Sequence, residues 1–223
     1  MRKGDVMADL KVNPWLTMWV RPRDTIRKIV DFNPKYRFAV LSGIYGFPLL
    51  LQIAQNMSLG ERLPAYAIVL IALVLCVFAG MIGISIQSAL LYWTGKWIGG
   101  QGSYLNIRAA NAWSNVPNIV TVATWLIFVA MFGNLAFFYE FPEGAFTGAV
   151  YTVLFLLSLI QLVISIWSLV IFLHALGEVQ GFSAWKALLN VIIPFVIVVA
   201  GIWIVGSLVM WGVQSLQPPP MAG

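Results

Sequence analysis

Long runs of uncharged, mostly apolar residues alternate with short charged segments along the chain. Five runs contain no Asp, Glu, Lys or Arg, and they cover 38–60, 63–95, 109–139, 144–177 and 187–223. Even the shortest, at 23 residues, exceeds the roughly 20 residues that a helix needs to cross a bilayer. The backbone must satisfy its own hydrogen bonds in hydrocarbon, so we expect each run to form a helix. The alternation typical of barrel strands is absent.

The predicted fold class is therefore all-α, a polytopic membrane protein with five transmembrane helices. The expected spans cover about 38–57, 66–93, 113–138, 149–175 and 189–212. The gap 97–107 is Gly-rich, and we expect it to be a loop. Residues 1–37 form an N-terminal segment, and residues 213–223 form a Pro-rich C-terminal tail. Because the first span begins only after 37 residues, a cleaved signal peptide is not expected.

The composition supports a membrane protein and excludes several kinds of site. Charged residues make up 9% of the chain, whereas a soluble domain carries about 25%. The only cysteine is Cys76 and the only histidine is His174, which excludes an internal disulfide and any Cys/His metal cluster. We therefore expect no metal and no cofactor.

The basic residues lie almost entirely on one side of the predicted bundle. If five helices cross, residues 1–37 and the loops near 96–108 and 186 share one side and hold 12 of the 13 Lys and Arg residues. The other side has Arg62 with Glu61, Glu140 and Glu143. By the positive-inside rule, the N-terminus is cytoplasmic and the C-terminal tail lies outside. The net charge of +5 is then explained by the orientation of the chain in the membrane and by attraction to anionic lipid head groups. Nucleic-acid binding is not needed to explain it.

The N-terminal segment contains two short helical patterns. Asn13-Pro14 is typical of a helix start, and Arg21-Pro22 precedes a second pattern with Ile26 and Ile29 on one face. Apolar faces with tryptophan and basic residues are typical of helices that lie in the membrane interface. We therefore predict one or two short interfacial cytoplasmic helices, either as an anchor or as a docking surface for a cytoplasmic partner. The predicted anchor residues are Trp15, Trp19, Arg23 and Arg27.

Two loops on the basic side resemble each other. One reads Gln101-Gly102, Arg108-Ala109 and Pro117, and the other reads Gln180-Gly181, Lys186-Ala187 and Pro194. Ser103 and Ser183 could cap the following helices, and each proline could kink its helix. Helices two–three and four–five could be related hairpins about an axis along the membrane normal, and chance similarity is the alternative.

These segments carry a resemblance to a known family. They are Arg21-Pro22-Arg23-Asp24-Thr25, Arg108 to Trp113 and Pro117, and Leu176-Gly177-Glu178 with Gly181 to Ala187 and Pro194. Over about residues 13–212 the chain resembles the Yip family, the Ypt/Rab-interacting-protein membrane domain. The resemblance implies a polytopic protein without known catalytic chemistry. Eukaryotic members are linked to Rab GTPases and vesicle traffic. The chain has neither their longer cytoplasmic N-terminal region nor their Asp-Leu-Tyr-Gly-Pro-like motif, so it is similar to a compact prokaryotic-type member. That resemblance implies a prokaryotic plasma (inner) membrane.

Polar side chains form stripes within three of the predicted spans. Ser158, Gln161 and Ser165 share a helix face in span four, as Asn111, Asn115 and Asn118 do in span three, and Gln87 lies in span two. Polar residues in lipid often face the bundle interior. They could line a polar path for a small solute or lipid head group. The interpretation that we favour is interhelical hydrogen bonding, at about 0.6 kcal/mol for each bond.

Four residues near the basic side are candidates for contacts with head groups or partners. His174 and Glu178 are four residues apart on one helix, where the carboxylate would favour a charged imidazole. A pH-sensing pair is one interpretation, and a histidine that hydrogen-bonds a neighbouring loop is the favoured one. Arg108, near Asn111, could bind an anionic head group or could simply set orientation, and Lys186 is the equivalent in the second loop.

Small residues predict close helix packing in the first two spans. Ser42 with Gly46 and Ala79 with Gly83 form small-xxx-small pairs. Such pairs could join helices within one subunit or between the subunits of a homo-oligomer.

The sequence does not favour an enzyme. It has no Ser–His pair at depth, no His-Glu-x-x-His motif and no phosphate loop, so we expect no catalytic residues. The predicted function is a non-enzymatic membrane scaffold or adaptor that binds a cytoplasmic partner or organises lipid. The alternative is a small transporter or lipid-moving protein with a polar path between spans two, three and four.

Overall fold

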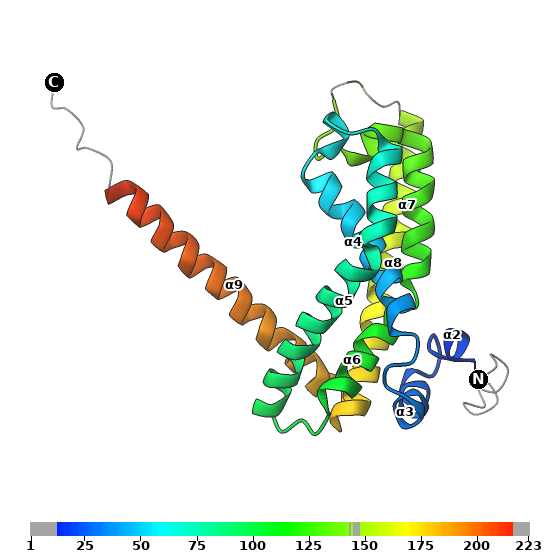
Figure 1. Ribbon diagram of the computed structural model, residues 1–223, viewed down its shortest axis with the longest axis vertical. Helices are drawn as coiled ribbons and strands as arrows, with labels where there is room; N and C mark the ends of the chain where they lie inside the picture. The colour runs from blue at the N-terminus through cyan, green and yellow to red at the C-terminus, as the bar shows by residue number, and fades with distance from the viewer. Residues whose placement is uncertain (1–12, 143, 145–147, 216–223) are drawn as a thin grey trace.

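The computed structural model describes residues 13–142, 144 and 148–215, and this part of the chain is helical (Figure 1). The α-helices and the two 3-10 helices (η) are, in chain order, α2 (Pro14–Thr17), α3 (Pro22–Phe32), α4 (Phe38–Asn56), η1 (Leu59–Glu61), α5 (Ala65–Trp97), α6 (Tyr104–Trp113), α7 (Asn118–Phe132), η2 (Gly133–Phe137), α8 (Gly148–Gln180) and α9 (Ala184–Ser215).

Among the described residues, five segments are long and apolar enough to cross a membrane: α4, α5, α7 with η2, α8 and α9. The predicted fold class, five membrane helices preceded by short helices, is therefore confirmed. Helices α5 and α8 have 33 residues each, which gives a length of about 50 Å. Since the hydrocarbon core is about 30 Å thick, both helices extend well beyond it.

The third predicted span, 113–138, differs from the structure at its first five residues. The structure has a separate helix α6 that ends at Trp113, a turn over 114–117, and α7 beginning at Asn118, so the loop is restricted to 98–103. The Ser103 side chain caps α6 by accepting a hydrogen bond from the N–H of Asn106 (3.3 Å). Pro117 lacks an N–H and its ring would clash with the preceding turn of a continuous helix, which accounts for the break.

The closest helix packing in the bundle joins α4 to α5. A Cβ atom at Gly46 would fall well inside contact distance of the Cys76 carbonyl oxygen, and a Cβ atom at Gly80 would do the same with Ser42. The predicted pair Ser42 and Gly46 therefore packs helices within one chain, against Gly80 and Cys76. Gly83 of the second predicted pair faces the Tyr45 ring of α4. Pro48 lies buried inside α4.

The N-terminal helices pack against the bundle. The side chain of Asn13 caps α2 by accepting a hydrogen bond from Trp15 N (3.2 Å). Met18, Ile26 and Ile29 are fully buried in a core cluster that includes Trp113. The apolar face of α3 and Met18, which follows α2, are therefore part of the protein core.

We call the end of the bundle that carries α2, α3 and the turn 181–183 the basic end, and the end that carries η1 and η2 the far end. The two similar loops lie side by side at the basic end, because Gln101 N donates to the Gln180 carbonyl oxygen (3.1 Å). Ser183 caps α9 as Ser103 caps α6, with Lys186 N as the donor (3.3 Å). Pro194, however, stays inside a continuous α9, so the two loops diverge at their prolines.

Helix α9 leaves the bundle at an angle (Figure 1). Its buried residues are Ala187, Asn190 and Pro194, and every residue from 195 to 211 is exposed. Some residues named in the sequence analysis lie outside the described part of the chain. They are the basic residues Arg2, Lys3 and Lys11, Glu143, and residues 216–223 of the tail.

Candidate functional site

A cluster of charged side chains joins α3 to α8 at the basic end, and we call Arg23, Arg27, His174 and Glu178 the clasp. Arg23 donates from Nε to His174 Nδ1 (3.4 Å), from Nη1 to Glu178 Oε2 (3.4 Å) and from Nη2 to the Phe182 carbonyl oxygen (3.2 Å). Arg27 Nε donates to Glu178 Oε1 (2.7 Å), and its Nη2 contacts the same oxygen. Residues about 150 positions apart are thereby brought together.

The electrostatics of the clasp differ from those of an isolated His–Glu pair. The Glu178 side chain is 15% exposed and is neutralised by two guanidinium groups. The pKa of Arg27 is raised above its usual value, mainly by its hydrogen bond to Glu178 and, to a smaller extent, by the charge of the Glu178 carboxylate. His174 accepts the hydrogen bond from Arg23 at Nδ1, an arrangement in which the ring proton lies on Nε2. His174 thus bonds a side chain of the N-terminal segment.

An amphipathic groove lies beside the clasp, between the α2–α3 turn and α8. Its volume is about 440 Å³. It brings the predicted anchor residues Trp19 and Arg23 together with His174. The other residues that line it are Val20, Arg21, Pro22, Asp24, Trp167, Val170 and Ile171. We call it the α3–α8 groove.

The residues of the predicted polar path fall into two separate pockets. Gln87, Asn111 and Asn115 lie in the pocket closer to the basic end, which has a volume of about 180 Å³ and is also lined by Tyr45 and Ser168. Asn111 is 3% exposed, and its amide donates to Gln87 Oε1 (3.1 Å) and Ser88 Oγ (3.1 Å). This pocket is small, and much of its polar surface is already hydrogen-bonded.

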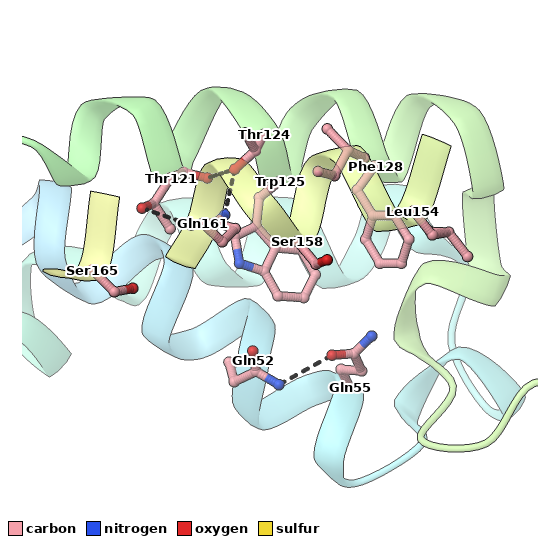
Figure 2. Close-up of a pocket in the computed structure, with 11 residues that line it drawn as sticks. Gln52, Gln55, Thr121, Thr124, Trp125, Phe128, Leu154, Ser158, Gln161 and Ser165 are labelled. Carbon is pink, nitrogen blue, oxygen red and sulfur yellow. Dashed lines mark hydrogen bonds between the residues drawn. The ribbon is translucent and has the colours of Figure 1, made fainter. Parts of the chain in front are cut away.

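Ser158, Gln161 and Ser165 line a larger groove of about 440 Å³ between α4, α7 and α8, which we call the far groove (Figure 2). Gln161 accepts from Thr121 Oγ1 (3.1 Å), and its own amide donates to Thr124 Oγ1. Across the groove, Gln52 Nε2 donates to Gln55 Oε1 (3.0 Å) (Figure 2). Trp125, Phe128, Leu154 and Leu157 supply the apolar walls. No residue lining the groove is charged.

Asn118 lies between the two pockets. Its amide donates to Asn115 Oδ1 (3.0 Å), and Asn115 donates in turn to the Asn111 carbonyl oxygen (2.7 Å). The three predicted asparagines therefore bond to one another in a ladder. These bonds are local and satisfy polar groups along one segment, whereas the bonds from Asn111 to Gln87 and Ser88 join two helices.

Several other predicted cations and aromatics form ring contacts at the basic end. The Arg108 guanidinium carbon lies 4.3 Å from the Phe38 ring centroid, and Lys186 Nζ lies 4.6 Å from that of Phe182. Trp15 packs edge-to-face on Trp113 with centroids 5.4 Å apart. Both cations that were predicted to contact head groups, Arg108 and Lys186, thus lie over aromatic rings. Each such cation–π pair contributes roughly 0.5–2 kcal/mol of stabilisation.

The sequence analysis did not identify several residues that line these cavities. Gln52 and Gln55 are polar and three residues apart in an apolar span, which is the same signal that singled out Gln161. Arg21 and Trp167 carry no such signal, because the α3–α8 groove forms only when segments more than 140 residues apart meet.

Within the part of the chain that the structure describes, no three His, Cys, Asp or Glu side chains come together as metal ligands. A protein-family model described as the Yip1 domain matches residues 16–206. No curated protein and no solved structure was found to be similar to the chain.

Proposed function

The chain belongs to the Yip family, and on that premise we propose that it is a non-enzymatic scaffold that holds a partner protein at its basic end. Family membership confirms the resemblance stated from the sequence, and the five apolar helices make the chain a multi-pass integral membrane protein. Under this proposal the basic end faces the cytoplasm, since nine of the ten Lys and Arg residues that the structure describes lie at that end. The resemblance to compact members of the family suggests the plasma membrane of a prokaryotic cell.

The observation that supports a scaffold is the packing of α2 and α3 into the bundle. Ile26 and Ile29 are fully buried, and the clasp ties the same helix to α8. The exposed side chains of Lys28 and Lys35 therefore belong to a pre-organised surface. A pre-organised surface loses less entropy on binding than a free segment does. Its charge favours a partner with an acidic face.

A photo-reactive residue placed at Lys28 in living cells is expected to cross-link one soluble protein of the cytoplasm. The same residue at Glu61, which is exposed at the far end, is expected to capture none. Lys35→Glu should weaken the Lys28 adduct, because charge complementarity sets the rate of encounter. Cross-linked bands identified by mass spectrometry provide the measurement.

The matched control for charge is Lys96→Glu, an exposed lysine at the end of α5. It should leave the Lys28 adduct unchanged, and the captured protein should co-purify with the wild-type chain. Capture of the same protein from both Lys28 and Glu61, or the absence of any protein adduct at Lys28, would contradict the proposal.

A second candidate function is a small transporter or a lipid-moving protein, and the far groove is the observation that favours it. An uncharged, hydroxyl- and amide-lined groove of about 440 Å³ is large enough for a small solute or a neutral head group. In this alternative the asparagine ladder would extend the path toward the basic end.

Reconstituted liposomes distinguish the two functions. If the protein is a scaffold, liposomes that contain it should move fluorescent phospholipid and small solutes no faster than protein-free liposomes. If it is a transporter, wild-type flux should disappear in Gln161→Leu, which removes the groove's bridging amide, and should persist in the control Gln101→Leu at an exposed position. Flux with that pattern would replace the scaffold proposal.

A further inference from the structure

The α3–α8 groove changes in character along the axis of α8. His174 lies six residues, or about 9 Å, from the end of α8, and Trp167 lies about 20 Å from it. Helix α8 is about 20 Å longer than the hydrocarbon core is thick. An equal overhang of about 10 Å at each end puts His174 near the head-group boundary and Trp167 within the hydrocarbon. The groove therefore connects the interface at the basic end with the membrane interior.

We propose that the α3–α8 groove binds one anionic phospholipid of the leaflet at the basic end, with its phosphate beside Arg21, Arg23 and His174 and an acyl chain against Trp167 and Val170. This inference goes beyond the scaffold function and does not depend on it. It uses only the groove and the position of the chain in a membrane.

The polar half of the groove still has hydrogen-bond donors available. Arg23 uses one N–H of each guanidinium nitrogen in the clasp, and a guanidinium has five in all. The Arg21 side chain is exposed at the groove, and the Nε2 proton of His174 is not used in the bond to Arg23. The first turn of α3 has no side-chain cap, which adds a modest preference for an anion.

Two carboxylates, Glu178 and Asp24, lie near these donors, and their negative charge opposes the binding of an anion. Both oxygens of Glu178 are occupied by Arg23 and Arg27. Asp24 also lines the groove, so the charges of Arg21 and Arg23 are partly offset. The balance remains cationic at the groove, and a phosphate bonded to arginine gains charge-assisted hydrogen bonds.

The apolar half of the groove favours an amphiphilic ligand over a soluble anion. A hydrophilic phosphate would leave the remaining, apolar walls unused. These walls are supplied by Trp19, Val20, Pro22, Trp167, Val170 and Ile171. Val170 and Trp167 are 38% and 43% exposed, so this half is open at the protein surface, where lipid surrounds the bundle. An amphiphile with an anionic head and an apolar tail matches both halves at once.

Native mass spectrometry of the purified full chain tests the proposal by titration with dioleoyl phosphatidylglycerol or dioleoyl phosphatidylcholine. One phosphatidylglycerol should be retained at concentrations at which phosphatidylcholine is not. Arg21→Glu changes the charge by two units, and each unit of charge near the surface changes lipid affinity about fivefold. The apparent Kd for phosphatidylglycerol should therefore rise roughly 30-fold. Val170→Trp, which fills the groove without changing charge, should also remove the bound lipid. Lys96→Glu carries the same charge change outside the groove and should retain it.

Three results would overturn the proposal. They are equal retention of the two lipids, an equal loss in Lys96→Glu and Arg21→Glu, and displacement of the lipid by excess glycerol phosphate, which would identify a site for a soluble anion. Thermal unfolding shows whether each variant is folded. If Val170→Trp does not fold, the comparison of Arg21→Glu with Lys96→Glu decides, because both positions are exposed.

Discussion

Gly46→Ala and Gly80→Ala are each expected to destabilise the protein by about 1–3 kcal/mol, as over-packing of a close-packed interior does. The new Cβ atom would fall well inside contact distance of a backbone carbonyl on the facing helix, whereas ordinary contact begins near 3.4 Å. A backbone atom cannot rotate away, so α4 and α5 must separate. Alanine also gains about 1 kcal/mol of helix propensity over glycine, but this gain is smaller than the cost of separation.

Gly43→Ala is the matched control on the same helix. Its Cβ atom would meet Val77 Cγ2 at 3.5 Å, which is ordinary contact. This variant should therefore be as stable as the wild type or slightly more stable. The stabilities of the variants are compared by thermal unfolding in detergent, monitored by circular dichroism. Equal stability of Gly46→Ala and Gly43→Ala would mean that the two helices are not held at this distance.

The helices themselves were predictable from the sequence because their signal is local. A run of 23 or more residues without charge has few alternatives to a membrane helix, so the five spans could be counted without knowledge of their contacts. Local signals also located the caps, since Asn13, Ser103 and Ser183 each bond a backbone N–H two or three residues ahead.

The break at Pro117 shows a limit of that local reasoning. Pro117 and Pro194 occupy similar places in similar loops, yet Pro117 is the N-cap residue directly before α7 and Pro194 lies within α9. The sequence around each residue does not show whether neighbouring helices can accept a continuous helix there, because proline in membrane helices is tolerated when the surroundings compensate.

The candidate sites were predicted less well because they depend on long-range contacts. The stripes on spans three and four were visible from helical spacing, but nothing local showed that they line two pockets instead of one path. Arg23 and Arg27 were predicted as interfacial anchors, and the structure pairs both with Glu178, which is more than 150 positions away. A net charge cannot reveal which residues form such pairs.

The side chain of Gln180 shows how the basic end is held together. It is 1% exposed, its Oε1 accepts from Gly102 N (3.1 Å), and its Nε2 donates to the Leu91 carbonyl oxygen (3.3 Å). Asn190 also donates to the Leu91 carbonyl oxygen (3.2 Å). A Cβ atom at Gly100 would clash with the Gln180 amide, so glycine there makes room for it. One amide thus joins α5, the loop before α6 and the end of α8.

Gln180→Met is expected to destabilise the protein by about 1–3 kcal/mol, the cost of leaving a buried polar group unsatisfied. Methionine has a similar length but provides no strong acceptor for Gly102 N and no donor for Leu91, so the change isolates hydrogen bonding from packing. Gln101→Met is the matched control from the other loop. The Gln101 side chain is exposed, and a change there should stay within about 0.5 kcal/mol of the wild type.

The effect of Gln180→Met should reach the clasp. Gln180 is two residues from Phe182, whose carbonyl oxygen accepts a hydrogen bond from Arg23. If the Gln180 amide positions this turn, hydrogen exchange in 22–32 should speed up in Gln180→Met and remain unchanged in Gln101→Met. Lower stability without faster exchange in α3 would show that the two contacts are independent. Equal stability of both variants would show that the Gln180 amide does not hold the basic end together.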